Sequence, residues 1–585
     1  FQQFSQQEFT IDPNNPEDFQ QLLATVTVQL PPLTGVVHLW CLDTSQVKDL
    51  TIKSLKASSK QGCGSTLHLV QALVKVGLSQ PPRLWLVTQG AQPVLDTNTG
   101  VPGLAQSPLW GMGRVISLEH PELSGGILDL DPNATNDEAV TTLLAEICDL
   151  NCEDHIAFRD GQRYVARLMC SSYKESQSIQ FKSDGTYLIT GGLGFLGLKL
   201  AQWMVEQGAR HLVLTGRQGL PETDLWAKLP QNTKAWKQIK AIESLEDMGA
   251  TVVVSAVDVS DFDEMSSILK QVNTIETPLR GIIHAAGIGG YQALKDMKLD
   301  ELECVLRPKA LGAWILHQLT KDISLDFFIC FSSAGSVWGA KGQGHYDAAN
   351  HFLDILAYYR RSIGLPAFSI NWGSLGVGGV VPEEYHQRLM QIGLEQLQPE
   401  QGFNALSFLL GTNAVQTVVA KVDWRKFKEV YQAKRQRSLL TEIKIGSEEV
   451  KEQLSVQLSG ILPQLEAAPE SKRYDLLITY LQGEVAKVLG LSVSQLPDPE
   501  QGFFAMGMDS LMAIELKNRL EANLGSSLPS TLAFEYPNIR SLSQYIGSKV
   551  LRWDFSTKPH SHNGNDKKPD KRSTTIKQLS ETELE

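Results

Sequence analysis

The stretch TYLITGGLGFLG, residues 186–197, decides which fold this chain takes. Its apolar start, Tyr187–Thr190, predicts a buried strand, and Leu198–Gln207 predicts the helix that follows. Between strand and helix, the glycines fill the pattern GxGxxG: Gly192, Gly194 and Gly197. Glycines in these places allow a tight turn, let the backbone approach a pyrophosphate and permit close helix packing, while the helix N-terminus attracts negative charge. The stretch therefore predicts a dinucleotide-binding site.

The end of the next predicted strand, His211–Leu214, indicates which dinucleotide would bind. Folds that bind NAD place an acidic residue there for the ribose 2′-hydroxyl, but this chain reads LTGR and has Arg217 instead. A guanidinium suits a 2′-phosphate, so NADP(H) is favoured over NAD(H). The competing interpretation is a structural glycine turn followed by a surface arginine.

Strands and helices alternate on both sides of this stretch, which predicts the α/β class with parallel sheets. After it, strands are expected at Thr251–Ala256, Gly281–His284, Asp326–Phe331 and Ala367–Asn371. Before it, strands are expected at Val36–Trp40, Leu84–Val87 and Gly126–Leu130, with a helical pattern at Leu67–Val76. The sequence TQGAQ follows Val87 and lacks the glycines that a pyrophosphate needs. The first half is therefore interpreted as a dinucleotide fold without a dinucleotide.

The composition fits a globular chain of about three domains, with 585 residues of which 42% are hydrophobic and 20% charged. The net charge of -12 argues against a nucleic-acid surface. No apolar run is long enough to span a membrane, and no metal site is expected. The cysteines are scattered, which favours a reducing cytoplasm: Cys41, Cys63, Cys148, Cys152, Cys170, Cys304 and Cys330. Because the chain opens at Phe1, we expect an excerpt from a longer polypeptide.

Four further segments carry a resemblance: HAAG (His284–Gly287), RPKALGAW (Arg307–Trp314), FSSAGSVWGAKGQGHYDAANHFLD (Phe331–Asp354) and INWG (Ile370–Gly373). With the glycine-rich stretch, they resemble the ketoreductase of a modular polyketide synthase, in the short-chain dehydrogenase/reductase superfamily. In that family the catalytic Tyr follows the catalytic Ser by about thirteen residues, as Tyr346 follows Ser333. The family's Asn after the Tyr and Lys upstream of the Ser correspond to Asn350 and Lys309. Simpler superfamily members exchange this Lys and Asn, so the arrangement indicates the polyketide and fatty-acid synthase branch.

The resemblance implies that hydride from a nicotinamide reduces a ketone, and each residue type suits that reaction. Negative charge grows on the carbonyl oxygen, which needs a positioned donor and a proton. Tyr346 would be the general acid, and Ser333 would donate a hydrogen bond to the same oxygen. Because tyrosine titrates near about pH 10, a Lys309 ammonium would stabilise its phenolate. Asn350, one helical turn beyond Tyr346, would orient a water relay or Lys309 itself.

The resemblance also implies which residues seat the cofactor. Asp258 and Val259, after the strand Thr251–Ala256, resemble the pair that contacts adenine, although an ordinary strand-end turn is the alternative for Asp258. The other expected contacts come from the glycine-rich turn, the arginine after the second strand and the HAAG segment: Thr190, Gly191, Gly192, Gly194, Phe195, Leu196, Gly197, Arg217, Ala285, Ala286 and Gly287.

Details of the same resemblance favour an A-type reductase, which gives an L-configured alcohol. B-type reductases carry Leu-Asp-Asp where this chain has Gly289-Gly290-Tyr291. A-type reductases often carry a Trp eight residues before the Tyr, as Trp338 stands to Tyr346, but Trp338 could equally be core packing. Gln343 replaces the His associated with epimerised substrates, which favours the non-epimerising subtype.

The first half has its own point of resemblance, in SPLWGMGRVISLEHPEL (Ser107–Leu123). This segment is similar to the most recognisable stretch of the truncated Rossmann-like structural subdomain that precedes the catalytic one in polyketide ketoreductases. Residues 1–175 fit that subdomain, with its N-terminal portion incomplete. The short junction Met169–Asp184 leaves no room for an inserted enoylreductase.

Near the C-terminus, FFAMGMDSLMAIELKNRL (Phe503–Leu520) resembles an acyl carrier domain. The carrier signature is Asp509-Ser510-Leu511, and Ser510 would carry a 4′-phosphopantetheine whose phosphodiester suits a helix N-terminus. Helices are predicted at Lys472–Leu489, Ser510–Leu524 and Ile539–Ile546. Taken as structure alone, the signature is an N-cap before an amphipathic helix.

The whole sequence therefore predicts two Rossmann-like subdomains followed by a small helical bundle. The expected parts are residues 1–175 (structural subdomain), 176–437 (catalytic subdomain), 438–470 (linker), 471–550 (carrier) and 551–585 (flexible tail). Within the tail, Ile576–Glu585 would begin a docking element or be merely solvated.

The expected activity is NADPH-dependent reduction of a carrier-bound β-ketoacyl thioester to the β-hydroxyacyl thioester. Expected partners are the tethered substrate, a phosphopantetheinyl transferase, other synthase domains and a downstream polypeptide, with no nucleic acid and no membrane. The alternatives are an inactive reductase fold that serves as a carrier scaffold, and a fatty-acid synthase fragment.

Overall fold

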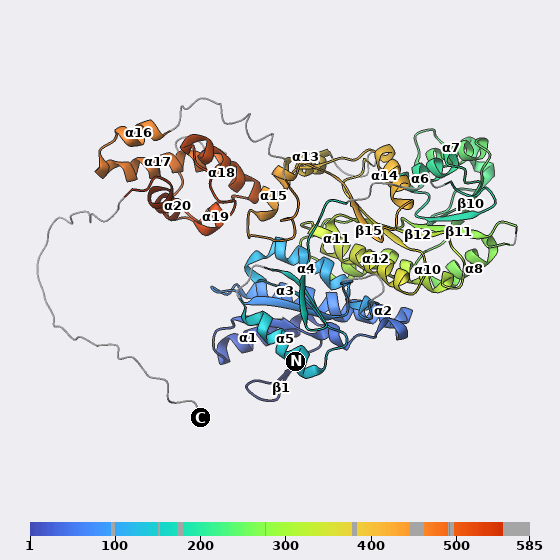
Figure 1. Ribbon diagram of the computed structural model, residues 1–585, viewed down its shortest axis with the longest axis horizontal. Helices are drawn as coiled ribbons and strands as arrows, with labels where there is room; N and C mark the ends of the chain where they lie inside the picture. Colours follow the sequence, from blue (N-terminus) through green and yellow to red (C-terminus); the bar gives the residue numbers. More distant parts are fainter. Residues whose placement is uncertain are drawn as a thin grey trace, which may run out of the picture. The chain divides into compact units, whose positions relative to one another are not determined.

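Figure 1 shows the computed structural model, in which the chain forms two compact units. The structure describes residues 1–94, 100–149, 153–171, 180–274, 276–376, 383–444, 461–489, 491 and 496–553. The expected docking element Ile576–Glu585, the tail from residue 554 and linker residues 445–460 lie outside the described residues. Within the described part, no helix has the length and apolar character needed to cross a bilayer. No cluster of His, Cys, Asp and Glu in that part is arranged to hold a metal ion.

A parallel sheet organises the second half of the larger unit. Its strands, within the described residues, run in the order β10-β9-β8-β11-β12-β13-β15. They are β8 (Thr186–Thr190), β9 (His211–Gly216), β10 (Thr251–Ala256), β11 (Leu279–His284), β12 (Phe327–Ser333), β13 (Phe368–Trp372) and β15 (Gln416–Val419). The chain starts at β8 in the middle, proceeds outward to β10 and then returns to pair β11 with β8. In open parallel sheets, ligands bind at the carboxyl ends of the strands beside such a reversal.

Alternate side chains of the central strands enter two different cores. Leu188 belongs to one core, whereas Tyr187 and Ile189 belong to the other. The Tyr187 side is covered by α6 (Phe195–Glu206), α7 (Lys234–Asp247) and α14 (Pro399–Leu410). The Leu188 side is covered by α8 (Phe262–Val272), α9 (Leu299–Leu306), α10 (Gly312–Thr320) and α12 (Gly344–Ser362). Cover on both faces explains why these strands are apolar almost throughout.

The first half of this unit is built on a second, smaller sheet in the order β3-β4-β5-β6-β7. Its strands are β3 (Gly35–His38), β4 (Arg83–Gln89), β5 (Ser124–Leu130), β6 (His155–Arg159) and β7 (Gln162–Val165). Its helices include α1 (Pro16–Gln29), α2 (Ile52–Ser59), α3 (Ser65–Val76), α4 (Pro108–Glu119) and α5 (Asn136–Cys148). The strands β3 to β6 are parallel, and β7 returns antiparallel through a turn at Asp160 and Gly161, both with positive φ. This is a Rossmann-like sheet closed by a hairpin.

A buried carboxylate fills the loop after β4, where a dinucleotide fold would hold its ligand. Asp129 accepts hydrogen bonds from the backbone N–H groups of Ala91 (2.9 Å) and Gln92 (3.0 Å). It also accepts one from Thr88 Oγ1 (2.6 Å) and pairs with Arg159 at 2.5 Å. Backbone N–H groups at this edge are those that a phosphate would otherwise engage. In this half, an internal anion satisfies them.

The two halves share one hydrophobic core rather than meeting across a hinge. Helix α4 from the first half packs along α12 of the second half. The side chains of Leu109, Met112 and Phe352 are all completely buried within the shared core. The position of α12 is therefore fixed from both halves of the unit.

The C-terminal helices form a small bundle of their own. They are α17 (Glu470–Val488), α18 (Ser510–Leu524), α19 (Leu532–Glu535) and α20 (Ile539–Tyr545), preceded by α16 (Leu462–Ala467). Completely buried side chains make the bundle core, among them Leu481, Phe503, Leu516, Leu520 and Leu542. Helix α18 begins at Ser510, and the Asp509 carboxylate caps it by accepting from the N–H of Met512 at 2.8 Å.

The predicted α/β class with two Rossmann-like sheets is confirmed, and β10 and α18 have the predicted bounds. Helix α6 begins three residues earlier than predicted, because Gly194 is its N-cap. The prediction of a linker directly after Arg437 agrees less well with the structure. Leu439 and Leu440 are buried beside Phe427 and Tyr431, so the packed structure continues beyond the expected end of the catalytic subdomain.

Candidate active site

The glycine-rich turn connects β8 to α6 at the chain reversal. Gly191 has φ of +70°, and a Cβ there would lie 2.9 Å from Ala286 Cα. A Cβ on Gly192 would lie 2.8 Å from the Ile189 carbonyl, and one on Gly197 would lie 2.5 Å from the Gly191 carbonyl. The turn is thus pressed against its own strand, the next loop and the helix start, which larger residues would prevent. This cradle fits a dinucleotide whose phosphates approach the backbone at the start of α6.

The residues expected at the adenosine end lie at the carboxyl ends of β9 and β10. Arg217 directly follows β9, and its side chain is exposed. The Asp258 carboxylate accepts from the N–H and Oγ of Ser260, at 2.9 and 2.5 Å, and pairs with Arg307 at 3.2 Å. Val259 is buried. The adenine contact of Asp258 and Val259 stays a prediction.

A histidine that the sequence interpretation left without a role joins the turn to the lysine segment. Ala286 N–H donates to Thr190 Oγ1 at 3.3 Å, and this hydroxyl lies 2.8 Å from His284 Nδ1. His284 Nε2 lies 3.1 Å from the Lys309 carbonyl. Burial, with the nearby Lys309 charge, lowers the pKa of His284 to about 3. A neutral imidazole with its proton on Nε2 satisfies every contact, so His284 bridges β8, β11 and the segment of Lys309.

Lys309 lies in a π-helical turn, Arg307–Leu311, between α9 and α10. Its side chain is 4% exposed, and its ammonium donates to the Phe331 carbonyl at 2.9 Å. The same nitrogen lies 5.1 Å from the centre of the Tyr346 ring. Burial lowers the pKa of Lys309 to about 8. The ammonium is held beside the tyrosine, and few protein groups replace the hydrogen bonds that it would make to water.

Ser333 and Tyr346 come from two different elements and line one cavity with Lys309. Ser333 ends β12, and its Oγ accepts from the N–H of Gly335 at 3.2 Å. Tyr346 lies in the first turn of α12. The cavity, of about 350 Å³, is also lined by residues of the glycine turn, the HAAG loop and the helix α11 (Gly335–Trp338): Leu196, Ala285, Gly289 and Trp338. A hydroxyl, a phenol and an ammonium therefore converge at the carboxyl edge of the sheet.

Asn350 stands one turn after Tyr346 on the same helix. Its side-chain nitrogen donates to the Tyr346 carbonyl at 2.8 Å, and its own carbonyl accepts from Ser332 Oγ at 3.1 Å. Its Oδ1 is buried and has no hydrogen-bond partner among the described residues. A buried acceptor needs a donor, and a water or the Lys309 ammonium would supply one. This arrangement suits the expected proton relay.

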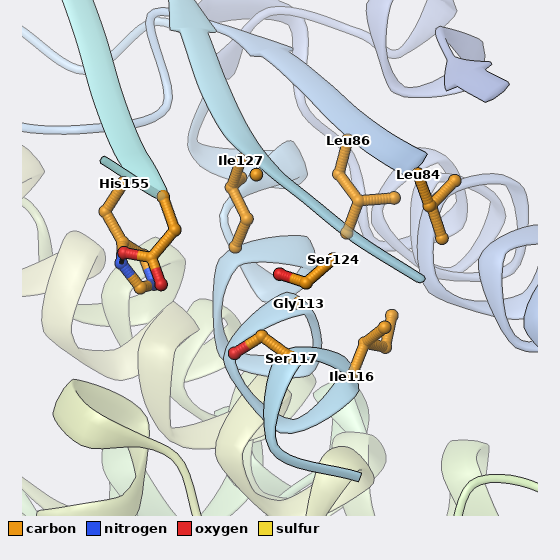
Figure 2. Close-up of a pocket in the computed structure, with 10 residues that line it drawn as sticks. Leu84, Leu86, Gly113, Ile116, Ser117, Ser124, Ile127 and His155 are labelled. Carbon is orange, nitrogen blue, oxygen red and sulfur yellow. Dashed lines mark hydrogen bonds and ion pairs between the residues drawn. The ribbon is translucent and has the colours of Figure 1, made fainter. Parts of the chain in front are cut away.

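A separate cavity lies in the first half, between β4, β5 and α4 (Figure 2). Leu84, Leu86 and Ile127 line it from the strands, and Ser117 and His155 add polar groups. Its volume is about 20 Å³, which is room for about one water molecule. This cavity is too small for a substrate.

Family models match three parts of the chain. The KR domain matches residues 185–376, and the Rossmann fold domain of the polyketide synthase extender module SpnB matches residues 6–168. The phosphopantetheine attachment site model matches residues 479–546.

Solved structures and curated proteins agree with these matches. An A1-type ketoreductase structure is 31% identical, with a TM-score of 0.65, and the match covers 74% of this chain and 87% of that one. Polyketide synthase GfsB of Streptomyces halstedii is 35% identical over 84% of this chain but only 9% of its own length. The pikromycin synthase component PikAIII of Streptomyces venezuelae is 33% identical over 82% of this chain and 30% of its own length. The chain thus spans less than a third of either relative.

Replacing the buried lysine should stabilise the protein at neutral pH. We expect Lys309→Met to raise the free energy of unfolding at pH 7 by about 1–3 kcal/mol, because no ammonium is then buried. The folded-state pKa of Lys309, about 8, lies below the usual 10.5, so between these pH values the unfolded chain binds more protons and the native protein gains stability as pH rises. The difference between the two proteins should therefore close from pH 8 to pH 10.5, measured by urea unfolding.

The control for this titration is Lys321→Met, because Lys321 is exposed. Its unfolding free energy should differ from that of the native chain by less than about 0.5 kcal/mol at every pH. A Lys309→Met protein that is less stable than the native chain at pH 7 would contradict the burial cost.

Proposed function

The chain belongs to the ketoreductases of modular polyketide synthases and also carries a phosphopantetheine attachment domain, and from this we propose that it reduces a carrier-bound β-ketoacyl thioester to the β-hydroxyacyl thioester with NADPH. The observation that carries the proposal is the meeting of Ser333, Tyr346 and Lys309 on one cavity beside the glycine turn.

The proposed reaction adds a hydride and a proton to the β-ketone. When bound, the reduced nicotinamide supplies the hydride to the carbonyl carbon. Tyr346 gives its phenolic proton to the carbonyl oxygen, and Ser333 donates a hydrogen bond to the same oxygen, so the developing charge is met by two fixed donors. The product is the alcohol, and a phenolate remains on Tyr346.

Lys309 and Asn350 support Tyr346 during this step. The Lys309 ammonium, 5.1 Å from the ring centre, stabilises the phenolate and so eases the departure of its proton. The unpartnered Asn350 Oδ1 holds the water or the ammonium through which Tyr346 regains a proton. His284 keeps the backbone of Lys309 in place from the cofactor turn.

The proposed product has the L configuration of A-type reductases. Trp338 lines the cavity, and it also packs against Trp424 and Phe427. A role in A-type specificity and a role in core packing are therefore compatible. Gly289 and Gln343 line the same cavity. The structural likeness to A-type ketoreductases supports this stereochemistry.

The carrier segment would present the substrate to this cavity. A chain bound as a thioester to phosphopantetheine on Ser510 reaches the reductase as part of the same polypeptide. Tethering raises the effective concentration of the substrate, so weak docking is enough for turnover. A phosphopantetheinyl transferase and the neighbouring synthase domains are the proposed partners.

Removing the phenol of Tyr346 tests the reaction. We expect Tyr346→Phe to lower turnover by about 10²–10⁴-fold, because the general acid is lost. NADPH oxidation with a simple β-ketothioester measures the rate, and chiral analysis of the native product should give the L alcohol. Tyr359→Phe, which removes a phenol from the same helix, is the matched control and should stay active. A Tyr346→Phe enzyme with more than about a tenth of native turnover would refute the assignment.

The cofactor preference depends on Arg217. In the native protein we expect a lower KM for NADPH than for NADH. Arg217→Ser should raise the KM for NADPH by about 10- to 100-fold, because a charge-assisted contact with the 2′-phosphate is lost, and should leave the KM for NADH nearly unchanged. Equal changes in the KM for NADPH and for NADH would show that Arg217 does not bind the 2′-phosphate.

The attachment site can be tested by mass. Incubation with coenzyme A and a phosphopantetheinyl transferase should add one phosphopantetheine to the native chain, and none to Ser510→Ala. Ser526→Ala, in the same bundle, should be modified like the native chain. Addition of the group to Ser510→Ala would place the site elsewhere.

A further inference from the structure

Helix α4 makes up most of the stretch Ser107–Leu123, and the proposed reaction assigns no role to this stretch. At Gly111 this helix lies directly against the second half. A Cβ on Gly111 would lie 2.1 Å from the carbonyl oxygen of Asp347, the residue directly after Tyr346. The two helix backbones are therefore in contact beside the proposed general acid, and any side chain at position 111 would push α12 away.

One buried guanidinium of α4 contacts both segments that supply the proposed donors. Arg114 Nη1 donates to the carbonyl of Ser336, and it lies 3.0 Å from His351 Nδ1. Ser336 lies in α11, three residues after Ser333, and His351 directly follows Asn350 on α12. Arg114 thus spans the gap between the Ser333 segment and the Tyr346 helix.

The neighbours of His351 determine which of its ring nitrogens carries the proton. Burial keeps the pKa of His351 well below its usual range, so the ring is neutral. Since arginine only donates, Nδ1 of His351 accepts from Arg114 and its proton resides on Nε2. The Gln92 amide, in the loop held by Asp129, lies 3.0 Å from Nε2, and it accepts the Nε2 proton when its oxygen rather than its nitrogen faces the ring. The first half therefore holds both sides of the His351 ring.

A second residue of α4 fixes two loops that contribute to the lining of the cavity. The Glu119 carboxylate accepts from the N–H of Gly342 at 2.6 Å and from the N–H of Leu294 at 2.8 Å. Gly342 lies in the loop that leads into α12, and Leu294 follows the HAAG segment in the chain. Both oxygens of one carboxylate thus hold backbone near Tyr346.

A buried carboxylate of the second half faces this contact. Asp354 accepts from Ser336 Oγ and Ser369 Oγ, both at 2.6 Å, and lies 3.8 Å from His351 Nδ1. It ties α11 and α12 to β13. The segments of Ser333 and Tyr346 are therefore held by both Arg114 and Asp354.

We propose that Arg114 and Glu119 are positioning residues, through which helix α4 of the first half fixes the separation of Ser333 and Tyr346. The inference rests on the proposed function, because it concerns the geometry of that reaction. A displacement of one ångström between reacting groups lowers a rate by about 10²-fold. The first half thereby contributes to the rate without contacting substrate or cofactor.

The test separates positioning from stability in the full chain. Arg114→Met should lower kcat by about 10- to 100-fold. The Kd for NADPH, followed by cofactor fluorescence, should change by less than about 2-fold, because Arg114 contacts Ser336 and His351 in the donor segments. His351→Leu should reproduce the loss, whereas His351→Asn, which keeps an acceptor near the Nδ1 position, should restore most of the turnover.

Two further variants keep the result interpretable. Glu119→Gln preserves the size of a half-buried side chain and should lower kcat in folded protein even if Arg114→Met folds poorly. Arg163→Met is the matched control, because it breaks an arginine pair with Glu146 at 2.7 Å in the same half. It should lower the melting temperature without changing kcat.

Native kcat in folded Arg114→Met, His351→Leu and Glu119→Gln would overturn the inference while leaving the proposed function intact. A parallel loss of NADPH affinity would also overturn it, because the effect would then not be confined to the donors. A native chain that does not oxidise NADPH with any β-ketothioester would overturn the proposed function and this inference with it.

Discussion

The parallel pairing of β8 with β11 is the constraint on which the rest of the site depends. Because the chain order reverses between these strands, the turn after β8 and the loop after β11 open at the same edge of the sheet. The next strand, β12, places Ser333 at that edge, and the helices around it bring Lys309 and Tyr346 to the same cavity. His284 joins the two central strands to the lysine segment. One topological feature thus supplies both the glycine turn and the edge at which the proposed proton donors meet.

The buried ammonium of Lys309 lowers the stability of the folded protein. Lys309 lies in a π-helical turn, and among the described residues its ammonium reaches one backbone carbonyl and the face of Tyr346. Desolvation disfavours its charged form, yet the charge is what would make the neighbouring phenol a better acid. Such a residue is retained only when the surrounding packing outweighs its cost. The shared core of the two halves provides that packing around α10 and α12.

Much of this architecture could be predicted from local sequence. The strand Thr251–Ala256 has its predicted bounds, since hydrophobic runs and strand-end glycines are local signals. The hairpin β6–β7 was missed although Asp160-Gly161 is a strong turn signal, and the late edge strand β15 was also missed. The convergence of Ser333, Tyr346 and Lys309 was predicted from a family resemblance and not from local sequence patterns. The contacts of His284 and Arg114 could not be predicted, because they join residues far apart in the chain whose meeting depends on packing.

The carboxylate in the loop after β4 also bears on how this half of the protein responds to its surroundings. A bound nucleotide stabilises a fold by an amount that grows with the logarithm of its concentration relative to its dissociation constant. Asp129 occupies the equivalent loop as part of the chain, so its occupancy is complete in every molecule and independent of metabolite supply. The first half thus holds a permanent anion where a dissociable one would otherwise bind, so the shape of this loop does not depend on nucleotide supply.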